Sequence, residues 1–190
     1  MQFDPDATAA VVVDMQNGFC HPDGSLYAPE SEEAIEPVRT VIETVRENGA
    51  HVIFTRDIHP PEQFENNHSY DEFERWGEHV VEGTWETEIV DELPVTDEDY
   101  VVTKHTYDAF YRTGLEGHLA THGINDLLIC GTLANVCVLH TAGSASLRDF
   151  RPVIIEDSVG FIEEHHREYA LEHADFLFGE VQPLEAIEFE

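Results

Sequence analysis

Residues 126–138 read DLLICGTLANVCV, an apolar run followed by a glycine turn and the start of a helical pattern. The apolar run, residues 126–130, is continuous rather than alternating, which is typical of a strand covered on both faces. The helical pattern extends over residues 135–148. A buried strand that leads through a tight turn into a helix is the repeating unit of α/β proteins.

The same unit recurs along the chain. Four further apolar or β-branched runs are expected to be strands, at residues 9–13, 51–55, 100–103 and 152–155. Three further helical patterns lie at residues 32–47, 114–122 and 165–176. This alternation predicts an α/β fold of three layers, a parallel sheet with helices on both faces. In such a sheet, functional groups gather at the carboxyl ends of the strands. The acidic tail after Gly179 is expected to add a short final strand.

A chain of 190 residues is expected to form one domain, residues 1–190. Residues 57–87 break the alternation of strands and helices, because this segment is polar, aromatic and contains several histidines. It is too long for a simple connection between two elements. We therefore expect an insertion that carries the substrate or metal site.

The charge of the chain restricts its partners. Forty acidic and nine basic side chains give a formal charge of −31, which argues against nucleic acid and anionic membranes. The sequence has neither a stretch of about 20 apolar residues nor a secretory signal, so we expect a cytoplasmic protein. The nine basic residues are eight arginines and Lys104, and this composition resembles the proteins of salt-accumulating halophiles. Because every other basic residue is an arginine, we expect the Lys104 ammonium to act as a compact charge beside a nucleophile. The alternative is that this lysine was retained by chance.

Three residues that could perform chemistry lie at or just after the ends of predicted strands: Asp14, Lys104 and Cys137. Cys137 would lie in the first turn of a helix, where the dipole is expected to lower the pKa of the thiol and free N–H groups can hold an oxyanion. Asp14 could take the thiol proton and later deliver it to a leaving amine, while Lys104 stabilises the thiolate. Taken singly, each residue could equally be structural. Cys20 and Cys130 are expected to be buried thiols without a disulfide partner.

Three segments resemble the signature segments of isochorismatase-like cysteine hydrolases: residues 13–19 (VDMQNGF), 104–111 (KHTYDAFY) and 130–138 (CGTLANVCV). The resemblance implies a six-stranded, mainly parallel sheet and a catalytic triad of Asp14, Lys104 and Cys137. It also implies a cis peptide between Thr132 and Leu133, which would turn the backbone amides of Leu133 and Cys137 toward an oxyanion.

Within this family, residues 55–61 (TRDIHPP) and 76–84 (WGEHVVEGT) look like the metal-binding segments of nicotinamidases. This likeness implies that Asp57, His59 and His79 hold zinc or iron with a position open to the pyridine nitrogen, and the residue types suit either metal. A further ligand could be Glu65 or His68, and the sequence leaves that choice open. The alternative is that the Asp-x-His pattern occurs by chance and binds no metal, because the chain contains twelve histidines.

The same likeness suggests residues that contact the substrate. Phe19 and Trp76 match positions that flank the nicotinamide ring, and Tyr111 is a third candidate; core packing is the alternative for all three. The chain departs from the nicotinamidase pattern at residues 77–80 (GEHV) and 83–87 (GTWET), where Pro-Pro-His-Cys and Gly-Thr-x-Gly-Ala would be familiar. We therefore expect the wall of the substrate pocket to differ from that of nicotinamidases.

The expected activity is hydrolysis of nicotinamide to nicotinate and ammonia, in pyridine-nucleotide salvage, through a thioacyl-enzyme on Cys137. A second hypothesis is an amidase of the same fold that acts on a carbamoyl or ureido compound, without metal and with a cationic clamp drawn from Arg56, Arg75 and Arg112. A hypothesis of another class is a non-catalytic partner-binding module or an acidic metal-buffering protein. A homo-oligomer, dimer or tetramer, is expected as well.

Overall fold

The computed structural model describes residues 1–65 and 72–190. Six strands form the central sheet: β2 (Thr8–Val13), β3 (His51–Asp57), β4 (Tyr100–Lys104), β5 (Asp126–Gly131), β6 (Arg151–Val159) and β7 (Glu180–Gln182). Their order is β4-β3-β2-β5-β6-β7 and every neighbouring pair is parallel, which confirms the predicted fold class. The chain runs outward from β2 to β4 on one side and from β5 to β7 on the other. The sheet therefore switches direction between β2 and β5, the place where open α/β sheets bind ligands.

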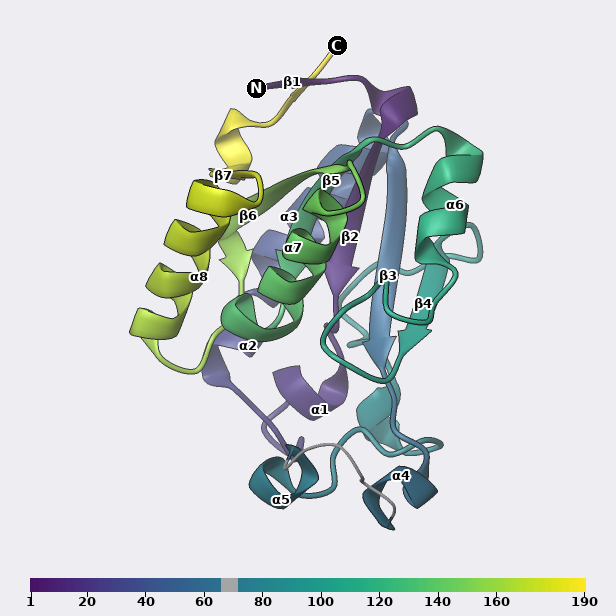
Figure 1. Cartoon of the computed structure of the whole chain (residues 1–190), viewed down its shortest axis with the longest axis vertical. Coiled ribbons are helices and arrows are strands. Elements are labelled where there is room, and N and C mark those ends of the chain that lie inside the picture. Colours follow the sequence, from purple (N-terminus) through teal and green to yellow (C-terminus); the bar gives the residue numbers. More distant parts are fainter. Residues whose placement is uncertain (66–71) are drawn as a thin grey trace.

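Helices cover both faces of this sheet (Figure 1). Helix α3 (Ile35–Glu47) packs on one face, while α6 (Leu115–His122), α7 (Leu139–Ser146) and α8 (Glu164–Leu177) pack on the other. The amphipathic spacing of Val38, Val41, Ile42 and Val45 explains the orientation of α3, because these residues share one helix face and are all buried. Along β2, alternate residues enter the two cores, with Val11 on the face of α7 and Val12 on the face of α3.

Two expected helices differ from their sequence patterns. The helix expected at residues 32–47 is divided at Ala34 into α2 (Pro29–Glu33) and α3. The helix expected at residues 135–148 begins with a π-helical turn, η3 (Ala134–Val138), and continues as α7. In this turn the Val138 N–H bonds to the carbonyl of Leu133, five residues earlier. Cys137 therefore lies in a wide turn rather than in a regular α-helix.

The ends of the chain pair with each other. Strand β1 (Gln2–Phe3) runs parallel to β8 (Glu188–Phe189), beyond η1 (Pro5–Ala7) and η4 (Leu184–Ala186). Both termini consequently lie at one end of the molecule in Figure 1. The expected final strand after Gly179 is present as β7. Among residues 1–65 and 72–190, no helix has the length and apolar character that crossing a membrane requires.

Short elements gather beyond the carboxyl ends of the strands. They are α1 (Asn17–Cys20), α4 (Pro61–Glu65), α5 (Glu72–Trp76) and η2 (Trp85–Thr87). The last three belong to residues 57–87, the segment expected to carry the substrate or metal site, and they lie at the end of the sheet opposite the termini (Figure 1). A parallel bridge between His59 and Val81 ties the start of this segment to its later part.

Candidate active site

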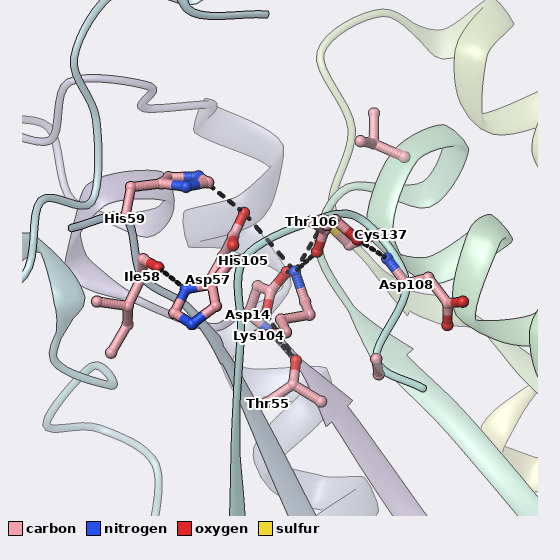
Figure 2. A network of polar contacts seen from close by, with 12 residues as sticks. Asp14, Thr55, Asp57, Ile58, His59, Lys104, His105, Thr106, Asp108 and Cys137 are labelled. Carbon is pink, nitrogen blue, oxygen red and sulfur yellow. Dashed lines mark hydrogen bonds and ion pairs between the residues drawn. The ribbon is translucent and has the colours of Figure 1, made fainter. Parts of the chain in front are cut away.

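Asp14, Lys104 and Cys137 meet at the carboxyl edge of the sheet, as the sequence predicted. Asp14 follows β2, Lys104 is the last residue of β4, and Cys137 lies in the turn after β5. The Nζ of Lys104 lies 2.7 Å from Oδ2 of Asp14 and donates to Sγ of Cys137 at 3.5 Å (Figure 2). All three side chains are buried. The arrangement places a base, a cation and a nucleophile in direct contact.

Backbone and hydroxyl groups hold the base and the cation in place. The hydroxyl of Thr55 donates to Oδ1 of Asp14 at 2.6 Å and accepts the Asp14 N–H at 3.1 Å. Asp14 has a φ of 50°, a left-handed conformation that aspartate tolerates better than most residues. Lys104 also donates to the carbonyl of Thr106 at 2.7 Å. These bonds leave Oδ2 of Asp14 turned toward Lys104 and the thiol.

Gly131 allows the turn that carries Cys137 to lie against β2. Its φ is 108°, and a Cβ at this position would lie 2.2 Å from the carbonyl oxygen of Val13. The next residue, Thr132, donates its N–H to that same carbonyl at 2.8 Å. Only glycine fits both the conformation and the close approach. The glycine therefore brings the thiol-bearing turn next to Asp14.

The pKa of the Cys137 thiol differs from the expectation. Burial raises this pKa well above its ordinary value, the Lys104 ammonium opposes the shift, and the Asp14 and Asp57 carboxylates add to it. The prediction that a helix N-terminus would lower the pKa is therefore wrong, because desolvation and two carboxylates outweigh the nearby positive groups. Burial would lower the pKa of Lys104, but the same two carboxylates and Cys137 raise it overall above its usual range. The free protein thus has a neutral thiol beside a charged lysine.

The turn between β5 and Cys137 presents backbone donors to the site. The peptide between Thr132 and Leu133 is cis, as the family resemblance implied. The hydroxyls of Thr132 and Ser31 form a buried hydrogen bond of 2.6 Å that fixes this turn from the side of α2. Within the described residues, the Leu133 N–H makes no hydrogen bond, whereas the Ala134 N–H bonds to the Gly160 carbonyl. The Leu133 amide is therefore available to an oxyanion near Cys137.

A cavity of about 560 Å³ opens above the thiol. Phe19 and Trp76, two of the three predicted ring contacts, line it together with Cys137, and Tyr107 also lines it although it was not predicted. Tyr111 is not brought to the cavity: it is 47% exposed and its ring lies under the Arg112 guanidinium. The reason is that Phe110 enters the core instead, which turns the next side chain outward. Tyr111 is therefore corrected from a cavity residue to a surface residue.

Of the predicted metal ligands, Asp57 and His79 line this cavity, whereas His59 is fully buried beside them. Asp57, His59 and His79 are buried; Oδ2 of Asp57 is 3.5 Å from Nε2 of His59, and the two imidazole centroids are 4.9 Å apart. Oδ1 of Asp57 is buried and has no hydrogen-bond partner among the described residues. Nδ1 of His79 lies 2.8 Å from the Gly77 carbonyl, and Nδ1 of His59 lies 3.2 Å from Oε1 of Gln63.

The Nδ1 atom of His79 faces a carbonyl oxygen, so the ring proton of His79 lies on Nδ1 and its Nε2 can serve as a ligand atom. Metal-binding histidines have this arrangement, in which the second nitrogen donates to an oxygen. His59 has an oxygen near each ring nitrogen, Oε1 of Gln63 near Nδ1 and Oδ2 of Asp57 near Nε2. Together with the unpartnered oxygen of Asp57, the residues fit zinc or iron. Of the two candidates for a further ligand, Glu65 is exposed at the end of α4 and His68 lies outside the described residues.

A second group of possible ligand atoms belongs to Asp14, Asp57 and Cys137, which all lie within 4.8 Å of one another. The Lys104 ammonium is part of this group, at 2.7 Å from Asp14, 3.7 Å from Asp57 and 3.5 Å from the sulfur (Figure 2). A metal ion here would face a buried positive charge at close range. The geometry therefore favours a metal position between Asp57 and the two histidines, His59 and His79, over a position beside Lys104.

The sequence profile of the Isochorismatase domain matches residues 8–186. The chain belongs to the isochorismatase-like hydrolase family. Nicotinamidase 3 of Arabidopsis thaliana is 30% identical to it over 182 residues, which cover 93% of this chain and 85% of the relative.

Two solved structures extend the comparison of this isochorismatase-like hydrolase. Pyrazinamidase of Pyrococcus horikoshii in complex with zinc has a TM-score of 0.83 and 28% identity, covering 94% of this chain and 99% of the other. N-carbamoylsarcosine amidase from Thermoplasma acidophilum has a TM-score of 0.79 and 34% identity, covering 93% and 95%.

Besides Tyr107, sequence reasoning missed Gln16, which helps to build the site of this hydrolase. Gln16 is fully buried, and its side-chain amide clamps the backbone of Asp57: Nε2 donates to the Asp57 carbonyl at 2.9 Å and Oε1 accepts the Asp57 N–H at 2.7 Å. Its Nε2 also reaches the carbonyl of Thr87. The signal for it was its place two residues after Asp14 in the first signature segment. The clamp holds Asp57 where both Lys104 and the histidines can reach it.

Of the three arginines considered for a substrate-carboxylate clamp, only Arg75 lines the cavity. It is an exposed residue of α5 at the cavity's rim. Arg56 does not line the cavity, and Arg112 lies on the Tyr111 ring. Of these three arginines, Arg75 is therefore the one placed to pair with a substrate carboxylate.

Proposed function

We propose that this isochorismatase-like hydrolase is an amidase that converts nicotinamide to nicotinate and ammonia through a thioacyl-enzyme on Cys137. The observation that carries the proposal is the contact of Lys104 with both Asp14 and Cys137 at the floor of a cavity whose wall holds Asp57 and His79. The similarity to proteins named nicotinamidase supports the choice of substrate. The proposed catalytic domain comprises residues 1–190, with residues 57–87 forming its substrate and metal insertion.

The first half-reaction forms the thioester. The Cys137 sulfur attacks the amide carbon while Asp14 takes the thiol proton, which the raised thiol pKa requires because little thiolate exists at rest. The N–H groups of Leu133 and Cys137 hold the negative oxygen of the tetrahedral intermediate. Lys104 remains charged and balances the carboxylates while the proton moves. Asp14 then donates the proton to the departing ammonia.

The second half-reaction repeats these roles with water. Asp14 takes a proton from the water that attacks the thioester, the same amides hold the oxyanion, and the sulfur leaves with a proton returned by Asp14. This step regenerates the neutral thiol and releases nicotinic acid, which loses its proton to solvent as nicotinate. A zinc or iron ion held by Asp57, His59 and His79 would supply a Lewis-acid position for the ring nitrogen. Phe19 and Trp76 provide apolar surfaces for an aromatic ring.

A second candidate is an amidase for a carbamoyl acid. Arg75 on the rim of the cavity favours it, since an arginine can pair with a substrate carboxylate, and so does the 34% identity to a protein named N-carbamoylsarcosine amidase. Against it stand the two buried histidines beside Asp57, which a carbamoyl substrate does not need. A partner-binding module without catalysis would not need the buried lysine next to a thiol.

Ammonia release from nicotinamide and from N-carbamoylsarcosine, measured side by side in concentrated potassium chloride, separates these candidates. We expect release from nicotinamide that falls after chelation and returns with zinc or iron. Ammonia release from N-carbamoylsarcosine alone, unaffected by chelation, would show that the substrate is a carbamoyl acid and not nicotinamide. The proposed mechanism on Cys137 would then remain. Release from neither compound by folded, metal-loaded protein would contradict both.

A further inference from the structure

The carboxylate of Glu86 in η2 connects two walls of the cavity. It accepts three hydrogen bonds: Oε2 accepts the Val80 N–H at 3.0 Å and the Ser25 hydroxyl at 3.0 Å, and Oε1 accepts the Ser25 N–H at 2.7 Å. Glu86 is half-buried and does not itself line the cavity. Its function must therefore be exerted through the residues that it holds.

On the metal side, Glu86 fixes the backbone at Val80. The Val80 N–H belongs to the peptide that joins it to His79, and the Val80 carbonyl accepts the His59 N–H at 3.0 Å. Val80 is fully buried with a φ of 38°, a conformation that a β-branched residue rarely adopts. Such a conformation persists only where its surroundings hold it. The bonds on the two sides of Val80 thus set the positions of both candidate histidine ligands.

On the substrate side, Glu86 holds the loop that contains Ser25. Ser25 and the next residues Leu26 and Tyr27 line the cavity, as His79 does. A second contact supports the same connection, because the Trp85 ring beside Glu86 packs edge-on against His21 with centroids 4.8 Å apart. One carboxylate therefore joins the part of the cavity wall that holds His79 to the part that holds Ser25.

We infer that Glu86 is a positioning residue that sets both the metal affinity and the substrate affinity of the site without touching metal or substrate. The inference rests on the metal site of the proposed function. All three partners of the carboxylate are donors, so a glutamine, which has only one acceptor oxygen, would turn an NH₂ group toward a donor. Glu86→Gln therefore keeps the shape of the side chain and removes part of the connection.

The test measures zinc affinity in the full-length protein by competition with a chromophoric chelator, with no amide present. We expect Glu86→Gln to bind zinc about 10-fold to 100-fold more weakly than wild type, the size of effect seen when groups behind metal ligands are lost. Glu82→Gln is the matched control, because it makes the same charge change at an exposed position of the same segment. Hydrogen exchange at the Val80 amide should accelerate in Glu86→Gln and not in the control.

Ser25→Ala separates the two walls, since it removes one bond on the substrate side and leaves the Val80 bond in place. We expect it to raise KM with little change in kcat and to leave zinc affinity as in wild type, whereas Glu86→Gln should change both KM and zinc affinity. A merely structural role would lower the melting temperature and leave the zinc affinity of the folded protein unchanged.

Equal zinc affinity in Glu86→Gln and Glu82→Gln would overturn the inference, and so would an unchanged KM in Ser25→Ala. If Glu86→Gln does not fold, the Ser25→Ala result decides. Wild type that binds zinc but releases no ammonia from nicotinamide would refute the proposed substrate, while the zinc and hydrogen-exchange measurements would still test Glu86.

Discussion

The ammonium of Lys104 lies 2.7 Å from the carboxylate of Asp14, and both side chains are buried. Asp57 lies 3.7 Å from the same ammonium, so one cation faces two carboxylates away from bulk solvent. Charges are stable in such a place only when they are paired, because desolvation costs several kcal/mol for each ion. The single lysine of the chain is thus the counter-ion of the candidate active site.

Replacing Lys104 with methionine should strongly destabilise the protein. The change leaves two buried carboxylates without a cation, and breaking a buried pair in this way costs about 3–5 kcal/mol. The measurement is the free energy of unfolding from urea titrations at constant salt. The double variant Lys104→Met with Asp14→Asn should lose less stability than the sum of the single variants. Additive losses would show that the pair is not coupled.

Replacing Cys137 with alanine should abolish hydrolysis and leave the fold intact. Loss of a covalent nucleophile should reduce kcat by at least about 10³-fold, since the remaining groups cannot form the thioester. The melting temperature should stay near that of wild type because a small side chain is exchanged for a smaller one. Cys20→Ala is the control, as this buried thiol lies outside the cavity. Residual activity within about tenfold of wild type would exclude Cys137 as the nucleophile.

Iodoacetamide should modify Cys137 and spare the other two cysteines of the folded protein. Burial raises the pKa values of Cys20 and Cys130 to about 12, and neither thiol lines the cavity. Burial also raises the pKa of Cys137, so its thiolate fraction is small at neutral pH and grows as the pH rises. The labelling rate should therefore increase about tenfold per pH unit below that pKa, as followed by peptide mass spectrometry. A rate independent of pH between 6 and 9 would indicate a stable thiolate instead.

Gly131→Ala should disrupt the site through the backbone. A methyl group there would lie 2.2 Å from the Val13 carbonyl oxygen, and alanine disfavours a φ of 108°. We expect a loss of about 3 kcal/mol or more in unfolding free energy. Gly117→Ala in α6 is the control, because nothing lies within 4 Å of its added Cβ. Equal unfolding free energies of the two variants would show that the stability of the fold does not depend on the close contact between Gly131 and β2.

His79→Ala should lower the metal content of the purified protein. The variant loses one of three proposed ligands, and zinc retained after dialysis, measured by elemental analysis, should fall well below that of wild type. His140→Ala is the matched control, since His140 lines the same cavity but is not a proposed ligand. Equal zinc content in the two variants would place the metal elsewhere.

Much of this architecture could be predicted from local patterns. Continuous apolar runs indicated five of the six sheet strands, because strands buried on both faces contain few polar residues. Asp14, Lys104 and Cys137 could be grouped because parallel strands end at one edge of the sheet. The strand order could not be read in this way, since it depends on which side of β2 each crossover takes.

The remaining features depend on contacts between distant parts of the chain. The raised pKa of Cys137 follows from burial and from two carboxylates on other strands, whereas the helix position alone suggested the opposite shift. Tyr111 points outward because Phe110 takes the core position in that turn. Gln16 and Glu86 act through hydrogen bonds to residues 41 and 61 positions away, which leave no periodic signal in the sequence.

The most direct test of the central claim is interception of the thioester. Metal-loaded protein is mixed with nicotinamide in concentrated potassium chloride with increasing hydroxylamine, and nicotinate, nicotinohydroxamate and ammonia are quantified together. A thioacyl-enzyme on Cys137 predicts that hydroxamate replaces nicotinate in proportion to hydroxylamine while ammonia is still released, and that Cys137→Ala forms neither product. Ammonia release that yields nicotinate alone at every hydroxylamine concentration, or products formed equally by Cys137→Ala, would contradict the account.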